Sequence, residues 1–313
     1  MLSFIIRRVV SGVVLVAVIS AVAFLLLYAG GGDIARRILG ENATAETVAK
    51  KTEELGLNRP LLTQYTDWLT SAFTGNLGRS WFTGELVSVS VTNRLAVTLS
   101  LVIGATLISA VIAIVIGVWA ARRGGAVDGT IQILSLVGFA VPGFLIALIL
   151  VLIFAVNLHW FKATGYVPIG TSFNGWISSV TLPIVALSIG AIASVAVQVR
   201  GSVIDATSRD YVRTLRARGL SERSVIYKHV LRNAGGPALA VLALQFVGLL
   251  GGAVVVEQIF SIPGMGQLSV RSTTLGDIPV VMGLVIAFAI LVVIVNLLID
   301  LAQAALNPKV RLA

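Results

Sequence analysis

The stretch Asp205-Ala-Thr-Ser-Arg-Asp-Tyr-Val-Arg-Thr-Leu-Arg-Ala-Arg-Gly219 separates two long apolar runs in the second half of the chain. The runs cover residues 180–199 and 238–256, and each is long enough to cross the hydrocarbon core of a bilayer as a helix. Charged side chains are costly inside a membrane, so the stretch between them belongs outside the bilayer. The sequence therefore predicts two membrane-spanning helices joined by a polar loop at residues 200–236.

Within this loop, the residue types predict a short helix that ends at a glycine. Thr207 and Ser208 can cap a helix start, and Asp210 would lie in the first turn, where a carboxylate suits the helix dipole. Gly219 is a typical C-terminal stop. After it, Ser221 can cap a second helix, which would run to about residue 231.

The predicted short helix has a basic face and a small apolar edge. Arg209, Arg213 and Arg216 follow one another at i, i+4 and i+7, so they share one face. Val212 and Leu215 supply the apolar edge.

The composition excludes an ordinary soluble domain. Of 313 residues, 57% are hydrophobic and only 12% are charged, and the mean hydropathy is +0.98, as in proteins with several membrane spans. The chain has no cysteine, which removes disulfides, thiolate metal ligands and cysteine nucleophiles. His159 and His229 are the only histidines and lie far apart in the sequence, so neither a metal site nor a cofactor is expected.

Six apolar runs predict six transmembrane helices, and the expected fold class is an all-α polytopic membrane protein. The runs cover residues 9–28, 95–121, 131–156, 180–199, 238–256 and 278–306. Arg7 and Arg8 precede the first run, which is longer than a usual signal-peptide core and is expected to be retained. The runs divide the chain into residues 1–30 with the first helix, an external segment at 31–94, a five-helix core at 95–306 that contains the loop 200–236, and a tail at 307–313.

The long segment after the first helix has a soluble character. It predicts two amphipathic helices, one from about Thr44 to Gly56 and one from Pro60 to about Phe73. Its aromatic side chains could form a small core and an interfacial belt on the bilayer, or they could form an exposed docking surface. These side chains are Trp68, Phe73, Trp81 and Phe82.

Proline and glycine mark two of the predicted spans. Pro142-Gly143 lies in the middle of the third span, where a proline removes a helical N–H and bends the helix. The bend is either a gate or a static packing kink. In the fifth span, Gly248, Gly251 and Gly252 would allow a neighbouring helix to approach closely.

The basic residues are distributed unevenly between the two sides of the predicted helices. With the amino terminus inside, the inner segments hold fourteen of the 23 Lys and Arg residues, whereas the segment 31–94 carries as many acidic as basic residues. The fourteen are Arg7, Arg8, Arg122, Arg123, Arg200, Arg209, Arg213, Arg216, Arg218, Arg223, Lys228, Arg232, Lys309 and Arg311. Because basic loops stay in the cytoplasm, both termini are expected there, and the net charge of +9 requires no nucleic-acid partner.

Four stretches carry a family resemblance. Tyr211-Val-Arg-Thr-Leu-Arg-Ala-Arg-Gly-Leu-Ser221 and His229-Val-Leu-Arg-Asn-Ala-Gly-Gly-Pro237 resemble the cytoplasmic coupling loop of ABC importer permeases of the dipeptide/oligopeptide group. Gly75-Asn-Leu-Gly-Arg-Ser-Trp81 and Phe260-Ser-Ile-Pro-Gly-Met-Gly266 are similar to external segments of the same group. The resemblance implies the type I importer permease fold. It also implies that the protein lies in the cytoplasmic (inner) membrane and that its transport depends on a binding protein.

In permeases of this group, the coupling loop seats in a groove of the ATP-hydrolysing subunit. Gly219 matches the glycine of that loop and Pro237 its closing proline, whereas Leu215 stands where the group usually has alanine. The residues expected to couple to the ATPase are Asp205, Arg209, Asp210, Tyr211, Arg213, Thr214, Arg216, Arg218, Gly219 and Ser221. The alternative is that the arginines only orient the chain in the membrane and bind anionic lipid headgroups.

The chain lacks the G-x-x-x-x-G-K-[ST] motif that cradles ATP phosphates, so it is expected to be a transport subunit and not an enzyme. The resemblance implies a homologous second permease, two ATPase domains and an extracytoplasmic substrate-binding protein as partners, with short peptides as the substrate. A permease for nickel or another small solute and an ATP-independent secondary transporter stay open as alternatives. An intramembrane enzyme is not favoured, because no catalytic pair of ionisable residues lies in mid-span.

Polar side chains within the apolar runs are candidates for the substrate path, because such groups usually face a bundle interior or a cavity. The candidates are Gln198, Gln245, Asn296 and Asp300, with Gln132 and Asn157 as further polar positions. For each, a hydrogen bond between helices is the alternative role. The resemblance implies a wide passage without a tight ligand pocket.

Overall fold

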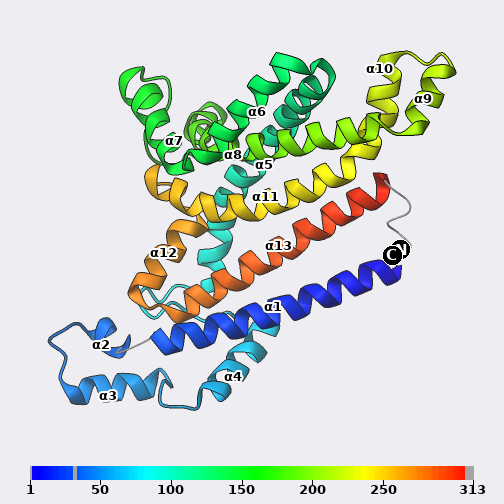
Figure 1. Cartoon of the computed structure of the whole chain (residues 1–313). Coiled ribbons are helices and arrows are strands. Elements are labelled where there is room, and N and C mark those ends of the chain that lie inside the picture. The colour runs from blue at the N-terminus through cyan, green and yellow to red at the C-terminus, as the bar shows by residue number, and fades with distance from the viewer. Residues whose placement is uncertain (1, 31–33, 307–313) are drawn as a thin grey trace. The chain divides into compact units, whose positions relative to one another are not determined.

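The computed structural model describes residues 2–30 and 34–306, which are helical almost throughout (Figure 1). In these residues, β structure is limited to an isolated bridge between Arg79 and Leu86. The elements are α1 (Leu2–Gly30), α2 (Ile34–Leu39), α3 (Ala45–Glu54), α4 (Leu61–Phe73), α5 (Val87–Arg123), α6 (Gly125–Ala140), α7 (Gly143–Leu150), the π-helix η1 (Val151–Asn157), α8 (Phe173–Thr207), α9 (Asp210–Ala217), α10 (Glu222–Ser224), the π-helix η2 (Val225–Val230), α11 (Leu231–Ile259), α12 (Met265–Leu275) and α13 (Ile278–Leu306). The tail expected at 307–313 lies outside the described residues.

Five helices of the described chain are long and apolar enough to span a membrane. They are α1, α5, α8, the continuous helix formed by α10, η2 and α11, and α13. A sixth span is reached when the bent pair of α6 with α7 and η1 counts as one. The all-α polytopic fold is therefore confirmed, with five or six apolar spans according to how the bent pair is counted.

The spans extend beyond the apolar runs that predicted them. α5 begins at Val87 and α8 at Phe173, several residues before the corresponding runs. At the start of α8, the Ser172 hydroxyl accepts a hydrogen bond from the N–H of Gly175 at 3.1 Å. Backbone hydrogen bonding and capping continue a helix through polar residues, so hydropathy marks only the part of each helix that suits the hydrocarbon core.

The third predicted span is two helices and not one kinked helix. α6 ends at Ala140, α7 begins at Gly143, and the axis bends by 92° between them. Pro142 has no N–H to donate to the carbonyl of Gly138, and it forces the preceding residue out of the helical region. Val141 is accordingly extended, with ψ of 122°. The kink expected here is thus a complete break in the helix.

One compact unit consists of residues 2–97 and 264–294. Its helices α3 and α4 match the two predicted amphipathic helices: Thr44 caps α3 by accepting from the N–H of Thr47 at 3.3 Å, and Pro60 immediately precedes α4. Trp68 and Trp81 pack against a buried cluster of Phe24, Ile34, Ile278 and Met282. They therefore belong to a small core, whereas Phe73 is 78% exposed.

A buried carboxylate in the same unit holds the loop after α4 against the start of α13. Asp277 is 3% exposed and accepts hydrogen bonds from Ser80 Oγ at 2.5 Å and from the N–H of Trp81 at 3.1 Å. Ser80 Oγ also accepts from the N–H groups of Phe82 and Thr83. A buried carboxylate is costly unless it is hydrogen-bonded, so this network fixes the loop in one conformation.

The other compact unit consists of residues 98–263 and 295–306 and is built around α8. α8 packs against α6, α7 and α11, and Figure 1 shows it lying between α6 and α11. Its buried face is rich in small side chains, among them Ala186, Ala191, Ala193 and Ala196. Small residues let helix backbones approach closely, which is how helices associate in a membrane.

A close backbone approach in this unit occurs at Gly117, where α5 meets α8. A Cβ atom at Gly117 would lie 2.7 Å from the carbonyl oxygen of Ala196 and 2.8 Å from Cβ of Val199. No side chain fits in that space. The packing of α5 against α8 therefore requires glycine at position 117.

The glycines expected to play this role in α11 differ from one another. A Cβ at Gly252 would lie 3.4 Å from the side chain of Leu187. At Gly248 and Gly251, by contrast, a Cβ would meet no described atom within 4 Å. The expectation of close helix approach is therefore wrong for Gly248 and Gly251 within this chain.

Candidate functional site

The polar loop contains a short helix, α9, but the loop begins later than predicted. α8 continues to Thr207, so Asp205 lies in its last turn and not on the short helix. Thr207 Oγ1 donates to the carbonyl of Val203 at 2.6 Å, and Ser208 Oγ donates to the carbonyl of Asp205 at 2.9 Å. Their hydroxyls turn back to α8, as Ser and Thr often do.

The expected cap by Thr207 or Ser208 is consequently wrong. The residue that precedes α9 is Arg209, whose side chain makes no capping hydrogen bond. Asp210 does lie in the first turn, as predicted. The basic stripe therefore starts at the edge of α9, with Arg213 and Arg216 on the helix itself.

The end of α9 is formed as predicted. Gly219 has a φ of +77°, a conformation that L side chains rarely adopt. The N–H of Leu220 donates to the carbonyl of Leu215 at 3.3 Å and that of Gly219 to Arg216 at 2.9 Å, which together close the helix end. Ser221 then caps the next helix by accepting from the N–H of Ser224 at 3.4 Å.

An ion pair across this turn ties the two helices together. Arg216 donates to both carboxylate oxygens of Glu222, at 3.0 and 2.7 Å. This hydrogen bonding raises the pKa of the Arg216 guanidinium. Both side chains are exposed, so the pair shapes the turn more than it adds stability.

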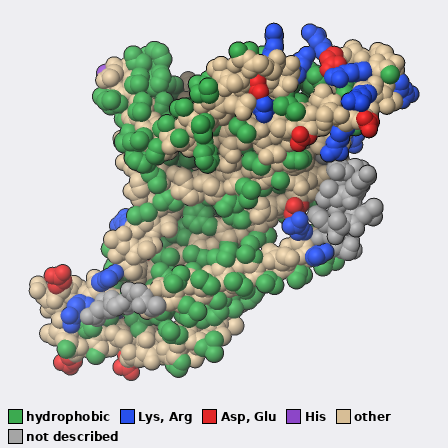
Figure 2. Space-filling model, viewed as in Figure 1, with side chains coloured by type: hydrophobic (Ala, Val, Ile, Leu, Met, Phe, Trp, Pro, Cys, Tyr) green, Lys and Arg blue, Asp and Glu red, His purple; other side chains and the backbone are tan. Residues whose placement is uncertain are grey.

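One face of α9 is anchored to the core of its unit and the other is exposed. Val212 is fully buried in a cluster with Val203, Ile226 and Val230, and Leu215 packs against the same cluster, which confirms the predicted apolar edge. Asn233 donates to the hydroxyl of Tyr211 at 3.2 Å. The exposed side carries Arg209, Arg213, Thr214 and Arg218. Figure 2 shows Lys and Arg side chains gathered at the upper right, where Figure 1 labels α9 and α10.

Pro237 does not close the loop. The segment after Ser221 forms a continuous helix through α10, η2 and α11, and Pro237 lies inside α11. The second helix predicted from Ser221 is therefore confirmed and runs much further, to Ile259. The helix passes through the π-helical turn of Val225–Val230 before the proline.

The four candidates for a substrate path lie on three helices, α8, α11 and α13. Gln198 donates to Ser202 Oγ within α8 at 3.1 Å, and Gln245 of α11 donates to Ser194 Oγ of α8 at 2.9 Å. Asn296 and Asp300 are half-buried on α13. Gln245 thus makes the bond between helices that was the alternative role, whereas Gln198 bonds within its own helix.

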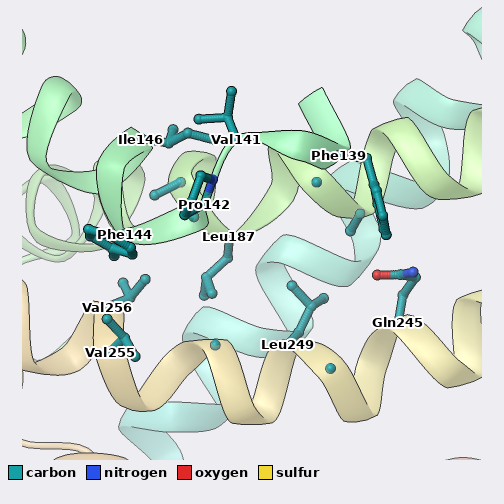
Figure 3. A pocket seen from close by; sticks show the side chains of 16 residues that line it. Phe139, Val141, Pro142, Phe144, Ile146, Leu187, Gln245, Leu249, Val255 and Val256 are labelled. Carbon is teal, nitrogen blue, oxygen red and sulfur yellow. The ribbon is translucent and has the colours of Figure 1, made fainter. Parts of the chain in front are cut away.

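Gln245 also lines a cavity of about 420 Å³ between the α6–α7 break, α8 and α11. Its other walls are apolar or glycine, and Figure 3 shows Pro142, Phe144, Leu187 and Leu249 around it. Of the four path candidates, only Gln245 is among the described residues that line this cavity. The sequence pattern alone could not show that the break at 141–143 opens onto it.

Sequence reasoning missed a half-buried ion pair between α6 and α8. Arg200 donates from Nε and an η nitrogen to the two carboxylate oxygens of Asp128, which also accepts from Gln132 at 3.1 Å. The available signal was a charge close to the end of a predicted span, with Asp128 just before residues 131–156 and Arg200 just after residues 180–199. Their separation in sequence hid the pairing.

A second missed group is Glu257 at the end of α11. Its carboxylate is fully buried and accepts a hydrogen bond from Thr98 Oγ1 of α5 at 2.6 Å. The predicted span ended at residue 256, immediately before Glu257. The helix instead continues to Ile259, which brings the carboxylate inside the unit.

Long apolar helices and an anchored basic loop together define a multi-pass membrane protein. Two family models cover nearly all of this chain: a binding-protein-dependent transport system inner membrane component at residues 113–312, and the N-terminal part of such a membrane component at residues 1–102. The chain belongs to this family, the membrane permeases of ABC transporters.

Curated relatives align over almost their whole length. One is the "Probable peptide ABC transporter permease protein y4tP" of Sinorhizobium fredii, 38% identical over 98% of this chain and 99% of that protein. The oligopeptide transport system permease protein AppB of Bacillus subtilis is 34% identical over 99% and 100% of the two chains. The glutathione transport system permease protein GsiC of Salmonella choleraesuis is 35% identical over 99% of each.

A solved structure shows the same fold. The MetNI methionine ABC transporter in inward-facing conformations matches with a TM-score of 0.53 and 16% identity, over 69% of this chain and 97% of that chain. At this identity the likeness concerns the fold alone. It agrees with the type I importer permease fold expected from the sequence.

Proposed function

We propose that this chain is the permease subunit of an ATP-driven importer that passes short peptides across the cytoplasmic membrane into the cell. Relatives whose names refer to a peptide, an oligopeptide and glutathione align with it from end to end. The three names refer to one class of substrate, since glutathione is itself a small peptide. The cargo class is therefore proposed from relatives that cover the whole chain.

The observation that supports coupling to a separate ATPase is the construction of the loop 205–221. Val212 anchors α9 to the core of its unit, while Arg209, Arg213 and Arg218 are exposed. Gly219 ends the helix in a conformation that favours glycine. A loop that served only to hold positive charge on one side of the membrane would not need this defined structure.

The proposed assembly contains a homologous second permease, two ATPase domains and an extracytoplasmic binding protein. Both termini and the loop 205–221 lie in the cytoplasm in this proposal, because that orientation places most basic residues inside. ATP binding would draw the ATPase domains together, and α9 would pass that movement to α8 and α11, between which its loop is inserted.

A matched pair of substitutions at Gly219 tests the coupling role. Gly219→Leu introduces a side chain at a φ of +77°, which costs about 1–2 kcal/mol, whereas asparagine tolerates this conformation better. A penalty of that size corresponds to about a 5- to 30-fold change in an equilibrium. We expect Gly219→Leu to reduce ATPase co-purification and ATP-dependent uptake of labelled peptide by about that factor, and Gly219→Asn to keep most of both.

The measurement uses the assembled transporter in proteoliposomes, and the amount of permease in the membrane is the control. Undiminished ATPase co-purification together with normal peptide-stimulated hydrolysis in Gly219→Leu would rule out the coupling role. Uptake that does not depend on ATP would instead indicate a secondary transporter.

A further inference from the structure

The α6–α7 break exposes main-chain polar groups within a predicted span. A helix end leaves its last carbonyls without intrahelical partners, and a helix start leaves its first N–H groups likewise. Here both ends meet at a 92° bend. Pro142, Gly143 and Phe144 are exposed on the surface of the chain.

Such a break cannot face lipid. Non-helical backbone at membrane depth is tolerated where it is buried in protein or lines a water-filled cavity, because lipid offers no hydrogen-bond partner. The break borders the cavity of about 420 Å³ described above. The volume is within the range of small-ligand sites.

The lining of this cavity combines apolar walls with few polar groups. Of its described lining residues, none has an ionisable side chain, and Gln245 is the one with a polar side-chain group. Gln245 uses its amide nitrogen to donate to Ser194 Oγ, so the amide oxygen remains an acceptor. In Figure 3 this side chain reaches from α11 toward Phe139 at the end of α6.

On the α11 side, the cavity is lined in part by glycine, which leaves space that a side chain would fill. Gly248 lines the cavity, and a Cβ there would meet no described atom within 4 Å. Its lack of a side chain is therefore not required by packing in this chain and leaves space in the cavity. Gly251 on the same helix has equally open surroundings but does not line the cavity.

We infer that this cavity is a subsite for a peptide in transit, an assignment that rests on the proposed function. At the break, Val141 N–H already donates to Val137 and the Pro142 carbonyl accepts from Leu145, so the Val141 carbonyl, the Gly143 N–H and the Gln245 amide oxygen would hydrogen-bond the peptide backbone, which all peptides share. The apolar walls, including Phe139, Phe144 and Leu249, would receive an uncharged side chain. Recognition of this kind favours peptides with apolar side chains without requiring one sequence.

Filling the cavity from α11 tests the subsite. Gly248→Leu should selectively reduce uptake of a peptide with a bulky apolar side chain, such as a phenylalanine-containing tripeptide, relative to trialanine. We expect a relative loss of about tenfold, as is usual when a hydrophobic pocket loses room for part of its ligand. Gly248→Ala should give a smaller loss in the same direction, and Gly251→Leu should leave the ratio of the two rates unchanged.

The assay measures both uptake rates in proteoliposomes that contain the complete transporter, with co-purification of the second permease as the control for assembly. An equal effect of Gly248→Leu and Gly251→Leu, or no effect of either, would overturn the subsite. So would loss of the second permease from the Gly248→Leu complex, because the cavity would then be filled by that partner. A wild-type transporter that takes up no peptide would overturn the proposed function itself, which is a distinct result.

Discussion

At the scale of single residues, Arg216 shows how a contact changes the meaning of a sequence pattern. By spacing alone it belongs to a basic stripe that could bind a partner or anionic lipid. In the structure it forms a two-point ion pair with Glu222 across the turn at Gly219. Its first role is therefore to hold the turn in shape.

A charge reversal and its compensating partner separate the two roles. Arg216→Glu should lower ATPase co-purification about two- to fivefold, because two carboxylates would then face each other across the turn. The double variant Arg216→Glu with Glu222→Arg restores the pair in reverse, so we expect it to recover most of the binding. Co-purification of the ATPase with each variant is the measurement.

Arg223→Glu is a suitable control, because Arg223 is exposed in the same loop and belongs neither to this ion pair nor to the residues expected to couple to the ATPase, so we expect little change. Failure of the double variant to recover binding would show that the cation at Arg216 contacts the partner directly.

At the scale of elements, α5 and α8 can pack closely because Gly117 has no side chain. The backbone of α8 lies against Gly117, with a distance of 2.7 Å from an added Cβ to the carbonyl of Ala196. A backbone atom cannot move aside as the end of a flexible side chain can. Insertion of a side chain must separate the two helices or distort one of them.

Gly117→Val should therefore destabilise the protein, by about 1–3 kcal/mol as in other overpacked interiors. The measurement is thermal unfolding of the purified chain in detergent. Gly201→Val is the matched control, since Gly201 is also a helical glycine but has no described atom within 4 Å of an added Cβ. A melting temperature lowered equally by both substitutions would contradict the packing argument.

At the scale of the whole molecule, orientation in the membrane is the property on which the proposed function depends most. The proposal places the loop 205–221 in the cytoplasm and the segment 31–94 outside. The absence of cysteine from the chain makes this directly measurable, because a single introduced cysteine is then the only thiol.

Ala45→Cys in α3 and Ala217→Cys in α9 replace exposed alanines in the two regions. In intact cells, we expect a membrane-impermeant maleimide to label Ala45→Cys, once any outer barrier is opened, and to label Ala217→Cys only after the cytoplasmic membrane is permeabilised. The unsubstituted chain, which has no thiol, is the control. Labelling of both positions from the same side would contradict the proposed orientation.

The sequence by itself determined the fold class, most of the helices and the C-terminal end of α9. Hydropathy predicts spans because the membrane core admits only apolar helices, and Asp210, Gly219 and Ser221 act through local geometry that depends on near neighbours. Contacts between residues that are distant in the sequence were visible only in the tertiary structure. The pairing of Asp128 with Arg200, the burial of Glu257 and the cavity beside the 141–143 break all join segments far apart in the chain. No local pattern encodes such contacts, because they arise only when helices that are distant in the sequence pack against one another.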